Sequence, residues 1–126
     1  MNKEGTGDRF SFTVDASTNA STLHLITGAQ GADVTITASL AGTTDQIDTF
    51  VVNNNNSNAA YYKIDFTADT PSDLLTITLD KTAVYTNRNN NRIYISGMGL
   101  TTIPEPSSLM RIGLAGLAFF AYCRRR

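Results

Sequence analysis

The chain is poor in the side chains that most catalytic sites need. Its 126 residues include one cysteine, one histidine and no tryptophan. Cys123 has no second cysteine to meet, so no disulfide can form within the chain. Any Ser-His-Asp or Cys-His constellation would have to use His24, and Cys123 belongs to a separate C-terminal segment. A zinc site would lack ligands of the required type. We therefore expect no enzymatic activity.

Acidic residues outnumber basic ones in the part of the chain before Pro104. That part holds six Lys and Arg against ten Asp and Glu, a net charge of −4. This balance argues against a nucleic-acid partner, which would need a basic face. The aspartates at expected turns and strand ends carry the oxygen ligands that calcium prefers: Asp33, Asp45, Asp48, Asp69 and Asp73. They lack the spacing of a calcium-binding loop, so we expect turn formers, with no metal and no cofactor.

Short segments in which apolar and polar residues alternate recur before the tail. The clearest run from Arg9 to Val14 and from Val34 to Leu40. Weaker versions occur at residues 23–25, 47–52, 62–66, 75–79 and 93–95. No helical period interrupts them, and strands with one apolar face need a second layer to bury it. We therefore predict an all-β domain over residues 1–100, folded as an antiparallel β-sandwich.

Glycines and a histidine give local expectations within this pattern. Gly28 and Gly31 are expected to end the second strand, while Gly97 and Gly99 are expected bulge positions in the last one. His24 alternates with two leucines, so it is expected on the solvent face of its strand.

Three tyrosines lie near asparagine-rich loops at residues 53–58 and 87–91. Tyr61, Tyr85 and Tyr94 are candidates for sugar contacts, because aromatic faces stack on sugar rings while Asn, Asp and Arg supply hydrogen bonds. Tyrosine is also common on strands for packing alone. Both interpretations stay open at this stage.

The last quarter of the chain changes in composition. A linker at residues 101–108 contains Pro104, Glu105 and Pro106, and prolines cannot enter a helix interior. Residues 109–126 follow, with an apolar run that ends in a cluster of positive charge. The side chains expected to hold this run in a bilayer include Ile112, Leu114, Leu117, Phe119 and Phe120. The charges expected to stop transfer are Arg124, Arg125 and Arg126.

The apolar run is a short membrane segment. Residues 112–123 would form a helix of ~18 Å, against a bilayer core of ~30 Å. Starting at Ser107 extends the helix to ~25 Å and places Arg111 inside it. The terminal arginines should stay on the cytoplasmic side, which leaves everything before Pro104 outside the membrane. A buried terminal helix is the alternative, although such a helix rarely ends in three charges of one sign.

The order of these parts has a known counterpart. Pro104-Glu105-Pro106-Ser107-Ser108, the apolar segment and the arginine-rich end together resemble the PEP-CTERM sorting signal of Gram-negative bacteria. The resemblance implies a membrane-anchored precursor exported across the inner membrane and processed by exosortase, a multi-pass membrane enzyme. It also implies a final place at the cell surface or outside the cell, often with exopolysaccharide in biofilm. Arg111 inside the apolar segment departs from the pattern.

The strand segments carry a second resemblance. Residues 10–14, 32–40 and 73–79 are similar to jelly-roll, galactose-binding-like domains of secreted bacterial surface proteins. That similarity favours a jelly roll over an immunoglobulin-like topology.

Residues 1–8 contain no apolar segment of the kind found in a secretory signal peptide. Because an exported domain must cross the membrane, we expect an upstream export signal, and a first strand with it. The resulting hypothesis is a non-enzymatic exported protein of the cell surface or extracellular matrix. The alternative is a carbohydrate-binding module acting on exopolysaccharide, for which the tail provides only delivery.

Overall fold

The computed structural model describes residues 2–4, 7–85 and 91–104. Eight β-strands make up the described part of the chain. They are β1 (Asn2–Glu4), β2 (Arg9–Asp15), β3 (Ser21–Gln30), β4 (Ala32–Leu40), β5 (Gln46–Val52), β6 (Asn58–Phe66), β7 (Leu74–Val84) and β8 (Arg92–Thr102).

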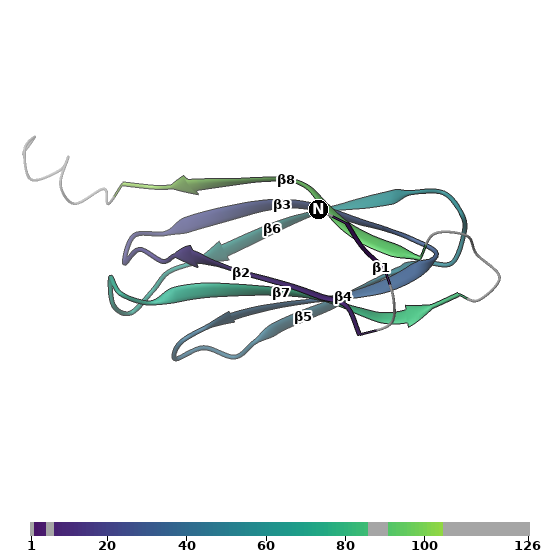
Figure 1. The fold of residues 1–126 in the computed structure, drawn as a ribbon. Helices are drawn as coiled ribbons and strands as arrows, with labels where there is room; N and C mark the ends of the chain where they lie inside the picture. The colour runs from purple at the N-terminus through teal and green to yellow at the C-terminus, as the bar shows by residue number, and fades with distance from the viewer. Residues whose placement is uncertain (1, 5–6, 86–90, 105–126) are drawn as a thin grey trace, which may run out of the picture.

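The strands form two antiparallel four-stranded sheets that pack face to face. The first sheet has the order β1-β8-β3-β6, and the second has the order β2-β7-β4-β5. Figure 1 shows β8, β3 and β6 as one layer over β2, β7, β4 and β5. The pairing is nested, because β4 pairs with β5, β3 with β6, β2 with β7 and β1 with β8. The predicted all-β sandwich is confirmed.

The core lies between the sheets and follows the alternation in the sequence. β4 shows the pattern most clearly, with every second side chain buried from Ala32 to Leu40. Leu25 and Ile93 of the first sheet and Val34, Ile77 and Leu79 of the second have no exposed surface. Each such side chain contributes roughly 1.5–3 kcal/mol relative to an exposed one.

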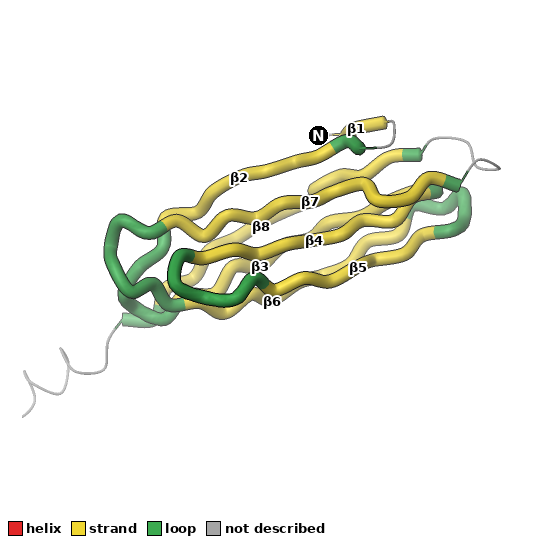
Figure 2. The backbone as a smooth tube through the Cα atoms, turned by 90° about the horizontal axis from the view of Figure 1, so that it is seen from below, coloured by secondary structure: helices red, strands yellow, loops and turns green. Residues whose placement is uncertain are grey.

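The loops gather at the two ends of the sandwich, as Figure 2 shows. Backbone hydrogen bonds join the loops after β2 and β6 at one end, where Ala68 N donates to Ser17 O. The chain leaves β8 at this same end, since Ile103 N donates to Ala20 O. At the other end Gly31, with a φ of 58°, turns the chain from the first sheet into the second. The asparagine-rich loop after β5 meets it there, because Gly31 N donates to Asn54 O.

Several strand boundaries differ from the sequence prediction. β3 continues through Gly28. The glycine does not end the strand, and it is needed because the Tyr94 side chain crosses the strand there and leaves no room for a Cβ. The register shift in the last strand falls at Ser96, beside Gly97, whereas Gly99 pairs regularly with His24. β1 was not expected at all, because three polar residues carry no periodic signal.

One edge of the first sheet is only partly covered. β1 pairs with residues 92–94 of β8, so residues 95–102 pair with β3 alone among the described strands. Met98 and Leu100 stand opposite the buried Leu25 and Leu23, yet they are 55% and 46% exposed. The interior of the sandwich is therefore open on this side.

Candidate functional site

The outer face of the first sheet carries two of the three predicted tyrosines. Tyr61 of β6 pairs with Ile26 of β3, and Tyr94 of β8 pairs with Gly28 of β3. These positions alternate with the buried residues of the same strands, so the tyrosine side chains point away from the core. Tyr85 follows β7 in the other sheet and donates to Asp33 Oδ1 at 3.0 Å, a contact that raises the pKa of its hydroxyl. It therefore does not join the other two.

Tyr61 forms an aromatic pair with His24. The two rings stack with centroids 5.9 Å apart and an angle of 15° between their planes. The Tyr61 hydroxyl also hydrogen-bonds His24 Nδ1. The β3–β6 register creates the pair, because Tyr61 lies opposite Ile26, two residues along β3 from His24. Tyr61 is 60% exposed, so its ring is both held in place and open to solvent.

Tyr94 lies flat across β3. Its hydroxyl donates to Asn58 O of β6 at 3.2 Å, and its ring occupies the space above Gly28. A Cβ on Gly28 would stand 2.4 Å from Tyr94 Cζ and 2.5 Å from Asn58 O. Glycine is thus required here for close approach. Ile26, which is 42% exposed, lies between the two tyrosines in the register of the sheet.

Two further glycines leave the neighbouring strand without side chains on this face. Gly97 and Gly99 of β8 pair with Ile26 and His24. A Cβ on Gly99 would meet nothing within 4 Å, and one on Gly97 would meet only Ile26 Cδ1 at 4.0 Å. Neither glycine has a positive φ. Such glycines weaken a strand and often mark a place where another molecule approaches the backbone.

A polar cluster borders this face. Thr22 Oγ1 donates to Asp65 Oδ1 at 2.5 Å, and Lys63 Nζ lies 3.0 Å from Asp65 Oδ2. The hydrogen bond from Thr22, and after it the Lys63 ammonium, hold the pKa of Asp65 below its usual value.

We call Tyr61, His24, Ile26, Tyr94, Gly97 and Gly99 the aromatic face.

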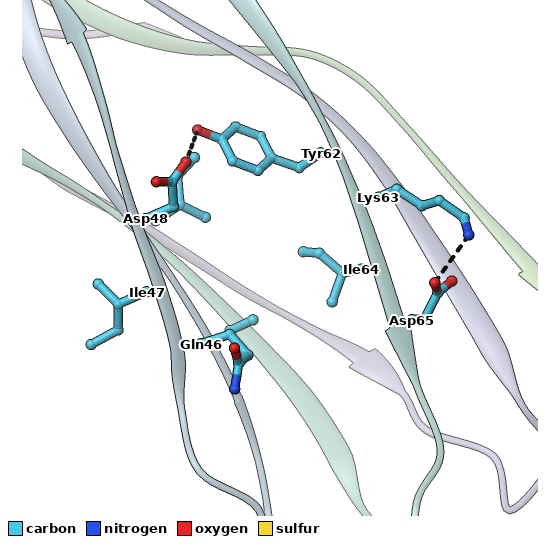
Figure 3. A pocket seen from close by; sticks show the side chains of 9 residues that line it. Gln46, Ile47, Asp48, Tyr62, Lys63, Ile64 and Asp65 are labelled. Atoms are coloured by element: carbon cyan, nitrogen blue, oxygen red, sulfur yellow. Dashed lines mark hydrogen bonds and ion pairs between the residues drawn. The ribbon is translucent and has the colours of Figure 1, made fainter.

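A groove opens where the edge strands β5 and β6 of the two sheets face each other. It has a volume of about 320 Å³ and an apolar floor that includes Ile36 and Ile64. Asp48 is opposite the buried Ile36 and so points inward, where its Oδ2 accepts from the Tyr62 hydroxyl at 2.9 Å (Figure 3). Burial, and then this hydrogen bond to Asp48, raise the pKa of Tyr62 to about 12.

The sequence prediction missed this groove. Gln46 and Asp48 occupy inward positions of β5, opposite Ala38 and Ile36. Polar residues at apolar positions of an alternating strand were the available signal. The polar groups that line the groove include Asp48, Tyr62 and Lys63. In the described ranges no group of three or more His, Cys, Asp or Glu side chains is placed to hold a metal ion.

The C-terminal segment can be compared only by its sequence. Pro104 is the last described residue, so Glu105, Pro106 and the predicted membrane helix at residues 109–126, with its apolar run and terminal arginines, lie outside the described residues. The described residues contain no helix that is long and apolar enough to cross a bilayer.

A comparison with protein families decides the identity of that segment. Residues 102–126 match the PEP-CTERM protein-sorting motif. The motif implies an exported, membrane-anchored precursor that exosortase processes. It begins at the last residue of β8, so the sorting signal adjoins the sandwich directly. No curated protein and no solved structure matches the chain.

Proposed function

We propose that this chain is a non-enzymatic surface or extracellular-matrix protein, delivered by its PEP-CTERM tail. The observation that carries the proposal is the junction at Thr102, where β8 ends and the sorting motif begins. The buried core residues all precede the motif, so removal of the tail would leave the core intact. Within the tail, Pro104-Glu105-Pro106 is the recognition element, residues 112–123 hold the precursor in the bilayer, and Arg124 to Arg126 stop transfer.

We also infer that the sandwich is a jelly roll. Support comes from the nested pairing of eight strands in the orders β1-β8-β3-β6 and β2-β7-β4-β5, which is how two Greek keys share two sheets. The β4–β5 hairpin is the innermost pair, and every other connection crosses between the sheets. An immunoglobulin-like arrangement would instead divide seven strands as four and three.

The sorting proposal is tested in the native host with and without exosortase. We expect the tail to be shortened and the sandwich to reach the surface or the medium only when exosortase is present. Mass spectrometry of the mature C-terminus is the measurement, and a variant with Arg124, Arg125 and Arg126 replaced by alanine is the control for membrane retention. An intact Arg126 in all of the surface material would contradict processing.

A second candidate function is carbohydrate binding on the aromatic face. The observation that favours it is the exposed Tyr61 ring, which His24 holds in place, with Gly97 and Gly99 on the other side of β3. Sugar rings stack on such aromatic surfaces, and the Thr22–Asp65–Lys63 cluster adds hydrogen-bonding groups at the border. The face lies on the outside of a sheet, where an extended polysaccharide would meet no obstructing wall.

Residues 1–103 immobilised on beads provide the test of this second function. The probes are a soluble β-glucan, a galactomannan and alginate. We expect Tyr61→Ala to abolish retention of the bound polysaccharide. We expect Gly99→Val to abolish it while the domain stays folded, because a Cβ added at this position meets no protein atom within 4 Å. Tyr85→Phe and Thr78→Val, on the other sheet, are matched controls. Retention that is equal in all four variants would exclude the aromatic face.

A further inference from the structure

A lysine is buried in the middle of the second sheet. The inward positions of β7 are Leu75, Ile77, Leu79 and then Lys81. The Lys81 side chain has no exposed surface. Buried lysines are rare because removing an ammonium group from water is costly. A lysine kept at a core position therefore calls for a specific role.

Two neighbouring groups fix the position of the Lys81 side chain. Nζ lies 3.1 Å from Asp8 Oδ2 and donates to the backbone oxygen of Asn91 at 3.0 Å. The backbone of Lys81 is fixed as well, because its N donates to Asp8 O at 2.9 Å. The residue just before β2, the inner side of β7 and the residue just before β8 thus meet at one nitrogen atom.

The contacts leave polar atoms unused. Asn91 Oδ1 and Asp8 Oδ2 are buried and have no hydrogen-bond partner among the described residues. The contact between Asp8 Oδ2 and Lys81 Nζ is an ion pair that lacks the alignment of a hydrogen bond. The Lys81 amine thus contacts the Asp8 carboxyl group and the backbone of Asn91, and the Asn91 carboxamide oxygen is itself buried. These three groups are what amide exchange between side chains requires.

We propose that Lys81 and Asn91 form an intramolecular isopeptide bond, with Asp8 as the proton carrier. Asp8 takes a proton from the Lys81 ammonium, and the neutral Nζ attacks Cγ of Asn91. The new Nζ–Cγ bond forms and the Cγ–Nδ2 bond breaks. Asp8 delivers its proton to Nδ2 and accepts one from Nζ, so that ammonia leaves and then carries the remaining proton away as ammonium. No oxidant or cofactor is needed.

The isopeptide bond would account for two features of the site. It replaces a buried charge by a neutral amide, and it uses the side chain of Asn91, whose oxygen has no partner among the residues that the structure describes. It would also tie β7 to β8 covalently. Small exported domains often rely on disulfides for such ties, whereas Cys123 is the only cysteine of this chain. Asp8 keeps 26% of its side chain exposed, which gives ammonia a route to solvent.

The test is the intact mass of the full chain, purified in detergent. We expect it to be about 17 Da below the mass of the sequence, because one ammonia is lost when the lysine amine displaces the amide nitrogen. Trypsin should not cut after Lys81, and should give a branched peptide that joins residues 64–88 to residues 89–92. Tandem mass spectrometry of that peptide locates the bond.

Three variants separate this bond from other losses of ammonia. Lys81→Met fills the same space without an amine, Asp8→Asn removes the proton carrier, and Asn91→Ala removes the electrophile. All three should show the full mass of their sequences, and circular dichroism checks that each remains folded. A wild-type chain at full mass overturns the proposal. So does a loss that persists in Lys81→Met, since that places it at another asparagine. A loss of about 18 Da, with water leaving from a Lys81–Asp8 link, overturns the assignment of Asn91.

Discussion

The two outer faces of the sandwich arise from the same alternation but carry different surfaces. The outward residues of the second sheet are mostly small hydroxyl side chains: Ser11, Thr13, Thr35, Thr37, Ser39, Thr49, Thr76 and Thr78. The outward residues of the first sheet include the aromatic face and the polar cluster beside it. We call these serines and threonines the hydroxyl face. It serves stability, since threonine suits a pleated strand and hydroxyls pair across strands, as Thr35 and Thr49 do at 3.2 Å.

The aromatic face departs from what stability alone would select. It places glycines inside a strand and leaves the Tyr61 ring exposed. Exposed aliphatic side chains occur on both faces, since Ile47 and Val51 of the second sheet are as open as Ile26 of the first. Proteins keep such departures where another molecule binds. This contrast is the basis for proposing that the first sheet recognises a ligand and that the second sheet supports it.

The largest effect should come from the core that both faces share. Leu25 lies under the aromatic face and Ile77 under the hydroxyl face, and neither has exposed surface. Leu25→Ala and Ile77→Ala should each lower the free energy of unfolding by about 2–5 kcal/mol, through lost burial and the cavity left behind. Denaturant unfolding should show one transition by both circular dichroism and tyrosine fluorescence. Two separate transitions would mean that the sheets are not one cooperative unit.

Two glycines on the aromatic face should respond in opposite directions. Gly28→Ala should cost about 1–3 kcal/mol, because the new Cβ overlaps the Tyr94 ring and a backbone oxygen that cannot move aside. Gly99→Ala meets no atom within 4 Å and should stabilise the strand by about 0.5–1 kcal/mol. Thermal unfolding of both variants under one condition is the measurement. A loss of stability in Gly99→Ala would show that this glycine is structural and remove it from the recognition surface.

The alternation in the sequence predicted the sandwich and most inward residues, because burial on one face of a strand leaves a period of two. It did not predict which strands share a sheet. Tyr61 and His24 are far apart in sequence, and only the β3–β6 register stacks their rings. Tyr85 had the same local signal as Tyr94 but belongs to the second sheet.

Strand ends were harder to predict, because they depend on tertiary contacts. The sequence pattern predicts that the strand at residues 75–79 ends at Leu79, whereas the inward series of β7 continues to Lys81. The partners of that lysine, Asp8 and Asn91, come from the two ends of the domain. No local pattern could have joined them. The same limit hid the Tyr62–Asp48 contact between the edge strands.

Alkaline pH should test the Tyr62–Asp48 contact between the two sheets. The pKa of Tyr62 is raised to about 12 in the folded chain, first by burial and then by its hydrogen bond to Asp48. The unfolded chain releases this proton near its ordinary pKa of 10.0, so the folded state holds more protons between these values. Stability should therefore fall as pH rises through this window. Tyr62→Phe should show a smaller fall, measured by denaturant unfolding at several alkaline pH values. An equal fall in both proteins would contradict the assignment.

Acid should produce the smallest effect, through Asp65 of the first sheet. Because Thr22 and then Lys63 lower the pKa of Asp65 below 3.8, this carboxylate contributes stability that is present above that pH and is lost as pH falls through its folded pKa. Thr22→Val should move the pKa of Asp65 back upward, as followed by NMR titration of the carboxyl carbon. Thr78→Val, whose hydroxyl contacts Ser11 on the other face, should leave that titration unchanged. If both substitutions move it equally, the two faces are electrostatically coupled and the division between them is weaker than their side chains indicate.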